Sequence, residues 1–274
     1  MAHDESQSVL RLDHVTVRFF ENKALDDISF EVRSGETRVI FGAAGSGKTV
    51  LLKTALGLIK PDSGTVQVFG QDIGGMQEMD LFRIRSRIGV LFQEGGLFDS
   101  LTVEENVAYP LENLAEAQLP PDQVRARAAE ALQFVELGQT LDKFPAELSG
   151  GMRRRVGIAR AIVTEPPLML YDSPTAGLDP ITAFTIIDLI AKERDLKNTT
   201  TVMATHRFQD GHFLATCRYN PAVGRAEPVT EAEENALGTV FMVLNQGRIA
   251  FEGSLGEFQA STDTYVAKFV RHEE

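Results

Sequence analysis

Hydrophobic residues in the first third of the chain form short runs rich in β-branched and aromatic residues, and Gly, Asp and Asn separate the runs. They cover residues 9–20, 25–32, 37–41 and 65–69. Runs of this length, bounded by residues that favour turns, are typical of β-strands. We therefore expect a strand-rich N-terminal region.

The pattern changes to a helical period between residues 101 and 164. Thr102 and Glu105 have the spacing of a capping box, which marks the start of a helix. A second helix is expected from Asp122, after two prolines, to Gly138. Its apolar positions share one face: Val124, Ala128, Leu132 and Val135. These segments predict a helical insert.

Continuous apolar runs follow at residues 168–171 and 201–204. Runs without alternation are typical of central parallel strands that helices cover on both faces. Residues 240–244 and 248–251 flank Asn245-Gln246-Gly247, which predicts a hairpin. The whole pattern predicts an α/β protein.

Residues 219–237 are polar and contain two prolines, and we expect a loop-rich excursion. A tolerated surface insertion is the simpler interpretation because loops accept extra length at little cost. A contact with an additional partner is the alternative.

Composition and charge limit the class of protein. The 274 residues include 27 Lys and Arg against 39 Asp and Glu, so the formal net charge is −12. With 43% hydrophobic residues the chain can bury a large core, which excludes a disordered or fibrous chain. Because nucleic-acid binders usually carry a basic surplus, we expect no nucleic-acid partner. The only cysteine, Cys217, cannot form an intrachain disulfide, which fits a reducing compartment.

The eight residues Gly42-Ala43-Ala44-Gly45-Ser46-Gly47-Lys48-Thr49 lie between an expected strand and an expected helix over residues 50–59. This pattern is typical of a loop that binds phosphate groups through inward N–H groups and the positive end of the following helix. Lys48 then reaches the β- and γ-phosphate oxygens, and Thr49 ligates Mg²⁺. We predict a nucleoside triphosphate, ATP, with Mg²⁺. A glycine-rich turn of another α/β protein is the alternative.

Further motifs narrow the class. Leu148-Ser149-Gly150-Gly151-Met152 precedes three arginines, and further characteristic strings lie at residues 91–98, 106–111 and 179–182. From about residue 9 to residue 258 the chain resembles the nucleotide-binding subunits of ABC transporters. Within that family it resembles the MlaF or Mkl type, which energises phospholipid transport between membranes.

The resemblance implies a fold and its subdivisions. We expect a P-loop NTPase core of the RecA-like kind, with an N-terminal antiparallel β subdomain and an inserted helical subdomain, in a single domain of residues 1–274. The expected parts are the core at about 8–92 and 165–258, the helical subdomain at about 93–164, and a C-terminal tail at 259–274.

The resemblance also assigns single residues. Asp172, at the end of a strand, would hold Mg²⁺, and Gln93 would meet the metal and the attacking water. His206 would contact the γ-phosphate. Phe19 lies where the family stacks an aromatic ring on adenine; Phe20 is an equal chemical candidate, and a core role for either ring is the alternative.

The signature residues Ser149, Gly150, Gly151 and Met152 are expected to begin a helix, whose N–H groups form an anion site. In the family this site contacts the γ-phosphate held by a second subunit, so that ATP joins two chains. Asp179 would belong to a loop that crosses the dimer axis. We expect a homodimer. A simple helix cap by Ser149 is the alternative.

Position 173 departs from the family. Hydrolysing members carry a glutamate that orients the attacking water, and this chain carries Ser173. A hydroxyl cannot serve as the base, and losing a positioned base costs about 10² to 10⁴ in rate. Three explanations stay open: a naturally slow subunit, replacement by another carboxylate such as Glu94 or Asp179, or an altered sequence that traps ATP. We hypothesise weak hydrolysis.

No run of the sequence approaches the length of a membrane span, and the first 14 residues lack the pattern of a leader. Transport would therefore need a separate permease. We expect it to dock near residues 93–101, where Leu97 and Phe98 are apolar anchors or interior packing. The expected location is cytoplasmic, peripheral on the inner face of the cytoplasmic membrane, with lipid-binding accessory proteins as further partners.

Two other functions compete with a transport ATPase. The first is an ATP-dependent dimerisation switch with little hydrolysis, which Ser173 favours. The second is a DNA-repair or translation ATPase of the same superfamily. It is disfavoured because the chain has no long coiled coil, no second cassette and no basic surplus.

Overall fold

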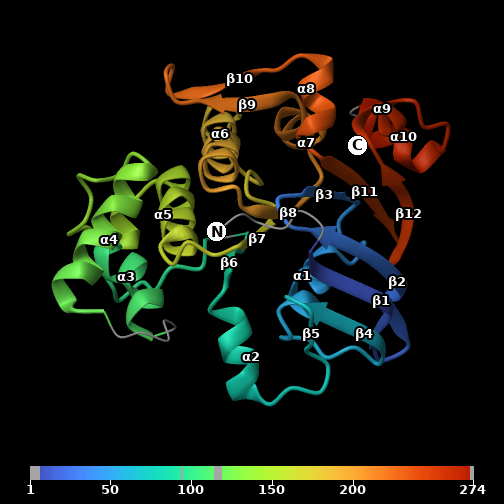
Figure 1. The fold of residues 1–274 in the computed structure, drawn as a ribbon, viewed down its shortest axis with the longest axis horizontal. Helices are drawn as coiled ribbons and strands as arrows, with labels where there is room; N and C mark the ends of the chain where they lie inside the picture. The colour runs from blue at the N-terminus through green and yellow to red at the C-terminus, as the bar shows by residue number, and fades with distance from the viewer. Residues whose placement is uncertain (1–6, 94, 114–118, 272–274) are drawn as a thin grey trace.

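The computed structural model describes residues 7–93, 95–113 and 119–271 (Figure 1). The strands are β1 Ser8–Phe19, β2 Asn22–Arg33, β3 Thr37–Phe41, β4 Ser63–Val68, β5 Gln71–Asp72, β6 Ile88–Leu91, β7 Leu168–Asp172, β8 Thr200–Thr205, β9 Cys217–Asn220, β10 Arg225–Pro228, β11 Thr239–Asn245 and β12 Arg248–Gly253. The helices are α1 Lys48–Ala55, α2 Glu78–Arg85, α3 Val103–Asn113, α4 Pro121–Phe134, α5 Gly150–Ile162, α6 Pro180–Lys197, α7 Phe208–Thr216, α8 Glu231–Ala236, α9 Leu255–Gln259 and α10 Thr264–Arg271, with a 3₁₀ turn at Pro145–Glu147.

A six-stranded sheet forms the centre, in the order β12-β11-β3-β8-β7-β6. Its neighbours pair in parallel from β11 to β6, and only β12 runs antiparallel, as the second strand of the predicted hairpin. Every residue of β3, β7 and β8 is buried because both faces of the sheet are covered. The predicted α/β class and its central parallel strands are confirmed. The carboxyl ends of β3, β7 and β8 all lie at one edge.

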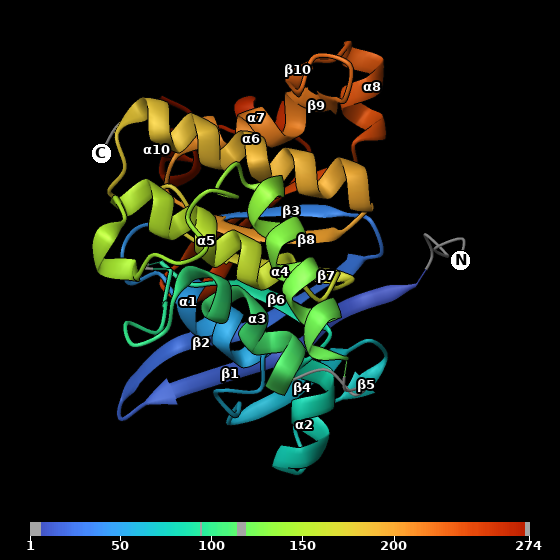
Figure 2. The ribbon, with the colours of Figure 1, turned by 90° about the vertical axis from the view of Figure 1, so that its left-hand side faces the viewer.

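The N-terminal strands form a separate antiparallel sheet in the order β2-β1-β4-β5 (Figures 1 and 2). Its inner face shares a core cluster with one face of the central sheet and with α1, through residues such as Leu12, Ile28 and Leu52. A second cluster on the opposite face joins the central sheet to α3–α7. The two clusters hold the phosphate-binding edge between them.

The helical insert begins where the sequence predicted. Thr102 and Glu105 form the capping box: the Glu105 N–H donates to Thr102 Oγ1 at 3.2 Å, and the Thr102 N–H donates to the Glu105 carboxylate at 2.7 Å. The next helix, α4, begins at Pro121 and ends at Phe134, before the predicted stop at Gly138. It ends early because Glu136 adopts a left-handed conformation, with φ of 61°.

The excursion at residues 219–237 contains more regular structure than the loop-rich segment that we predicted. β9 and β10 form an antiparallel hairpin, and α8 follows it. Two local features stabilise the turn of this hairpin. Asn220 Oδ1 accepts from the Ala222 N–H at 3.0 Å, and Gly224 has a φ of 79°. Asp188 and Asp195 of α6 accept backbone N–H bonds from the hairpin, at 2.8 Å and 2.7 Å.

The chain end expected as a tail contains α10, which packs against the core. Val266 of this helix is fully buried. The Phe269 ring lies 6.0 Å from the ring of Phe41, at the end of β3. The helix therefore contacts the strand from which the phosphate loop begins.

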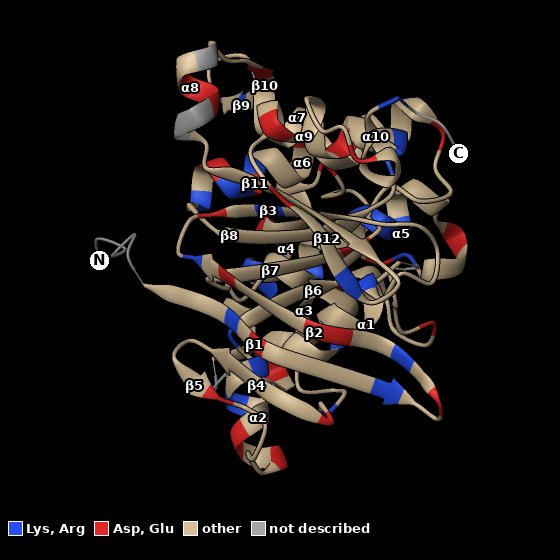
Figure 3. Cartoon of the chain, turned by 90° about the vertical axis from the view of Figure 1, so that its right-hand side faces the viewer, with Lys and Arg blue, Asp and Glu red and all other residues tan. Residues whose placement is uncertain are grey.

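Charged residues of both signs are interspersed over the face formed by β1, β2 and β12 (Figure 3). Arg38, which is only 3% exposed, pairs with Glu36 at 2.8 Å and with Glu252 at 2.6 Å. On this face the acidic surplus is not gathered into one region. Within the residues that the structure describes, no helix has both the length and the apolar character needed to cross a bilayer.

Candidate functional site: a phosphate loop at the edge of the central sheet

The loop of residues 42–49 leaves the buried strand β3 and enters α1, as predicted. Gly45 and Gly47 have φ of 77° and 109°, a region that L side chains rarely adopt. A Cβ at Gly42 would lie 2.3 Å from Ser46 Oγ, so this turn closes tightly on itself. Gly47 has no side chain to cap α1, which leaves the first N–H groups of the helix available to an anion.

Lys48 folds back over the loop. Its ammonium donates to the Gly42 carbonyl at 2.6 Å and to the Ala43 carbonyl at 2.9 Å. Burial lowers the pKa of Lys48, and the negative charge of Asp172 opposes that shift. A half-buried cation at a helix start fits the phosphate groups of a nucleotide.

The two expected metal ligands meet at this edge. Thr49 Oγ1 donates to Asp172 Oδ2 at 2.7 Å, although the two residues are 123 positions apart. Asp172 is 4% exposed and ends β7. One hydroxyl and one carboxylate are the donor set that Mg²⁺ takes when phosphates and waters complete its shell, so the residues fit this ion. Gln93 is exposed in the segment after β6.

Ser173 follows directly, half-buried and held by its backbone. Its N–H donates to the Ala204 carbonyl at 2.8 Å, and its carbonyl accepts from Arg154 at 3.1 Å. Its hydroxyl lies 3.4 Å from Asp172 Oδ1. The position beside the Asp172 carboxylate is therefore fixed from β8 and α5, and it carries a hydroxyl. Glu94 lies outside the described residues.

His206 is exposed at the end of β8. The neighbouring Asp210 is 3% exposed and accepts from Thr205 Oγ1 at 2.9 Å and from Thr175 Oγ1 at 2.5 Å. Burial raises the pKa of Asp210, against the hydrogen bond from Thr175. Asp210 thus ties the loop after Ser173 to the strand that ends at His206. Sequence reasoning missed Asp210, and its only signal was an acid four residues after the histidine.

Ser149 is the N-cap of α5, and its Oγ accepts from the Met152 N–H at 3.2 Å. Ser149 therefore caps the helix, as the alternative interpretation of this motif predicted. Ser149 is also an exposed residue. A Cβ at Gly151 would lie 2.4 Å from Thr182 Cγ2. The signature therefore lies directly against the start of α6.

Asp179 is the N-cap of α6. Its Oδ1 accepts from the Ile181 and Thr182 N–H groups at 3.1 Å, and its Oδ2 accepts from the Thr182 hydroxyl at 2.6 Å. The Thr182 hydrogen bonds lower the pKa of the Asp179 carboxyl. Both carboxylate oxygens are engaged within the chain, and a contribution from Asp179 to the reaction stays a prediction.

Phe19 and Phe20 end β1 and are 46% and 103% exposed. The core alternative for these rings is therefore wrong, and their faces are accessible to a planar ligand.

The segment at residues 95–101 is held by two side chains that the sequence did not reveal. Arg160 donates to the carbonyls of Gly95 and Gly96, both at 2.8 Å. Asn106 exchanges two hydrogen bonds with the backbone of Phe98, at 2.8 Å and 3.0 Å. Of the two expected anchors, Leu97 packs on the core, whereas Phe98 is 41% exposed.

Comparison with known proteins decides the family. The family model described as "ABC transporter" matches residues 25–176, more than half of the chain. The chain belongs to the ABC transporter family. ABC cassettes bind ATP with Mg²⁺, in agreement with the phosphate loop and the Thr49 and Asp172 pair.

This ABC cassette has curated relatives with differing names. The "Methionine import ATP-binding protein MetN" of Mesorhizobium japonicum is 42% identical over 206 residues, 75% of this chain and 56% of that protein. The "Probable ribonucleotide transport ATP-binding protein mkl" of Mycobacterium leprae is 37% identical over 192 residues, 70% of this chain and 55% of that protein. The chain spans about half the length of the curated relatives it matches.

Solved structures share the whole fold of the cassette. The dimer of the ATP-binding cassette MJ0796 bound to ADP and Pi superposes with a TM-score of 0.74 at 29% identity, covering 90% of this chain and 99% of that chain. The cbiO1 protein of Clostridium perfringens, part of the ABC transporter complex cbiONQ, superposes with a TM-score of 0.74 at 26% identity. The match covers 98% of this chain and 96% of that chain.

Proposed function

We propose that the chain is the ATP-binding and ATP-hydrolysing subunit that energises an ABC transporter. The observation that carries the proposal is the close pairing of Thr49 with Asp172 beside the Lys48 loop. A loop, a cation and a hard-oxygen pair are the parts that phosphoryl transfer requires. The dimeric cassette bound to ADP and Pi supports this assignment at 29% identity.

Each predicted residue has a role in this proposal. Bound MgATP supplies the phosphoanhydride bond that is broken. Lys48 and the N–H groups of residues 42–49 neutralise phosphate charge, while Thr49, Asp172 and Gln93 hold the metal. His206 orients the terminal phosphate from the end of β8, and Phe19 supports the base by stacking.

Dimer formation completes the site. We propose that Ser149 and the N–H groups of Gly150 and Gly151, with Met152 beside them, bind the terminal phosphate held by a second copy. The same Ser149 oxygen that caps α5 is exposed for this contact. Asp179 and its neighbours then lie at the seam, since Gly151 packs directly on Thr182.

A second function, an ATP-dependent dimerisation switch, is favoured by Ser173. A side chain without a base at this position binds and closes on ATP more readily than it splits ATP. The two functions differ in turnover and share the nucleotide site.

The cargo and the partners belong to the same proposal. We propose phospholipid transport between membranes, supported by the MlaF-like and Mkl-like motifs, whereas the names of the relatives include methionine and ribonucleotide transport. The permease would contact the segment at residues 93–101, where the exposed Phe98 ring lies 4.7 Å from the Tyr109 ring, with the two ring planes tilted by 44°. This places the cassette at the inner face of the cytoplasmic membrane, as one domain with the subdivisions predicted above and with lipid-binding accessory proteins beside it.

Nucleotide binding by Lys48→Ala tests the proposal. We expect the substitution to weaken MgATP binding by at least about 100-fold, because it removes a charge-assisted contact to the phosphates. Lys60→Ala, at an exposed lysine after α1, is the matched control and should bind as the parent does. Equal binding by Lys48→Ala and the parent would remove the proposal.

The transport role is tested separately by affinity purification from native membranes with mass spectrometry. A polytopic membrane protein and bound phospholipid in the complex support transport of lipid. Purification of the chain without any membrane protein supports the switch.

A further inference from the structure

The hydroxyl of Tyr265, in the second position of α10, contacts the phosphate loop. It accepts from the Ala43 N–H at 3.1 Å and donates to the Leu244 carbonyl at 3.2 Å. A phenol has one hydrogen to donate and lone pairs to accept, so both capacities are used here. The hydroxyl thus joins three elements: the loop, the end of β11 and the C-terminal helix.

The C-terminal helix holds Tyr265 firmly. Asp263 Oδ1 accepts from the N–H groups of Tyr265 and Val266 at 2.8 Å and 3.0 Å, which fixes the start of the helix. Val266 is fully buried, and the Phe269 ring packs edge-on against the Tyr265 ring at 5.4 Å. The packing of α10 and of the Tyr265 ring therefore sets the position of the hydroxyl.

Ala43 is the residue at which Tyr265 and Lys48 meet. Its N–H donates to Tyr265, while its carbonyl accepts from the Lys48 ammonium at 2.9 Å and from the Ser46 N–H at 3.1 Å. One residue thus carries the tyrosine contact at its N–H and the two loop contacts at its carbonyl. Because the preceding Gly42 leaves no room for a Cβ, this part of the loop has little freedom to rearrange.

From this geometry we infer that Tyr265 is a positioning residue that holds the phosphate loop in its nucleotide-accepting shape, so that the C-terminal helix sets the affinity for ATP. The inference rests on the proposed function. It gives the segment after residue 259 a role in nucleotide binding, through Ala43 and without contact to the nucleotide itself.

Tyr265→Phe removes one oxygen and keeps the ring that packs on Phe269. We expect amide exchange of Ala43 to become faster in the nucleotide-free variant, because its N–H loses its acceptor. We also expect MgATP to bind about three- to tenfold more weakly, the effect of losing one hydrogen bond, and turnover at saturating ATP to stay unchanged. Tyr219→Phe, at a tyrosine of β9, deletes the same atom away from the loop and should match the parent in all three measurements.

The outcomes separate this inference from the proposed function. If the parent itself binds no nucleotide, the proposed function fails, while Ala43 exchange in the nucleotide-free chain still tests the contact. If Tyr265→Phe lowers the unfolding temperature but leaves Ala43 exchange and ATP affinity equal to those of the parent, Tyr265 only packs the helix and the inference is overturned.

Discussion

The backbone of Ser173 is held in one position beside the Asp172 carboxylate. The residue has a φ of 51°, and its peptide groups are held by Ala204 and Arg154, so its Cβ direction is set by the surrounding strands and helix. The neighbouring Asp172 is already committed to Thr49. A carboxylate at position 173 would thus supply the basic group that the Ser173 hydroxyl does not.

Ser173→Glu is expected to raise steady-state phosphate release by roughly 10² to 10⁴, the usual contribution of a positioned base. Ser173→Gln, which has the same size but no basic oxygen, should remain near the parent rate. Both variants are measured at saturating MgATP with the binding affinity checked. Fast turnover of the parent, equal to that of Ser173→Glu, would show that another group serves as the base.

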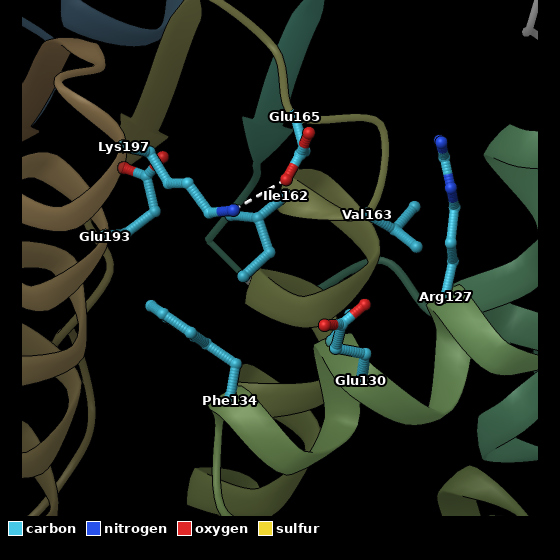
Figure 4. Close-up of a pocket in the computed structure, with 9 residues that line it drawn as sticks. Arg127, Glu130, Phe134, Ile162, Val163, Glu165, Glu193 and Lys197 are labelled. Atoms are coloured by element: carbon cyan, nitrogen blue, oxygen red, sulfur yellow. Dashed lines mark hydrogen bonds and ion pairs between the residues drawn. The ribbon is translucent and has the colours of Figure 1, made fainter.

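Glu193 is a further buried acid, near the C-terminal end of α6. It lines a cavity of about 300 Å³ between α4, α5 and α6, where Lys197 contacts Glu165 at 2.6 Å (Figure 4). Its Oε1 accepts from Thr199 at 2.6 Å, whereas its Oε2 has no partner among the described residues. Burial raises the pKa of Glu193 from 4.5 to about 7.

The raised pKa makes the stability of the chain depend on pH. The folded state holds this proton more tightly than the unfolded state, so its contribution is complete below about pH 4.5 and is lost as the pH rises to about 7. Glu193→Gln carries no such proton. Its free energy of unfolding relative to the parent should increase by about 2 to 3 kcal/mol between pH 5 and pH 7.5.

Urea unfolding of both chains at the two pH values measures this difference. Glu112→Gln, at an exposed carboxylate of α3, is the control and should show no such increase. A Glu193→Gln effect that is the same at pH 5 and pH 7.5 would contradict a raised pKa.

At the scale of elements, the sequence predicted the strands and helices whose positions depend on the local pattern of hydrophobic residues. The strand ends at Phe41, Asp172 and Thr205 could be placed because continuous apolar runs leave few alternatives to buried parallel strands. The loop motif predicted a helix over residues 50–59, whereas α1 covers Lys48–Ala55. Pairing of Thr49 with Asp172 followed from the motif and not from spacing, since no local rule joins residues so far apart in the chain.

Other elements depend on contacts that a pattern does not contain. The β9–β10 hairpin is held by Asp188 and Asp195 of α6, which lie far from it in the sequence and accept hydrogen bonds from its backbone N–H groups. The segment after β6 is fixed by Arg160 from α5, and the phosphate loop by Tyr265 from α10. In each case a side chain from one element satisfies the backbone of another, which requires the tertiary structure to be known.

The close contact between α5 and α6 requires a residue without a side chain at position 151. Gly151→Ala would place a Cβ 2.4 Å from Thr182 Cγ2, and we expect this overlap to cost about 1 to 3 kcal/mol of unfolding free energy. Thr182→Ser removes the clashing methyl group but keeps the hydroxyl that Asp179 binds. The double variant should therefore recover most of the loss.

Gly150→Ala is the matched control for this pair. Its Cβ would lie 3.9 Å from Leu178 Cδ2, an ordinary contact, so its unfolding free energy should stay close to that of the parent. Chemical denaturation of the four variants and the parent gives the coupling energy. Equal losses in Gly151→Ala with and without Thr182→Ser would locate the strain elsewhere.

For the whole molecule, the signature and the start of α6 form one exposed surface with apolar side chains on it. Ile181 is 81% exposed and Phe184 is 53% exposed on α6, whose Thr182 lies against Gly151 of the signature. A single phosphate loop covers only one side of a bound nucleotide, and this surface would cover the other side in a second copy. Association of two chains should thus require bound ATP, and Ser173 should make the dimer long-lived.

This requirement predicts a nucleotide-dependent change in mass. The parent is expected to be a monomer without nucleotide and a dimer with MgATP, because each ATP adds contacts across the seam. Ser149→Arg should bind MgATP with the affinity of the parent yet remain a monomer, since the larger cation blocks the surface but lies outside the loop of the same chain. Ser63→Arg, at an exposed serine of β4, should dimerise as the parent does. Analytical ultracentrifugation with and without MgATP distinguishes these cases, and a Ser149→Arg chain that dimerises normally would place the second subunit on a different face.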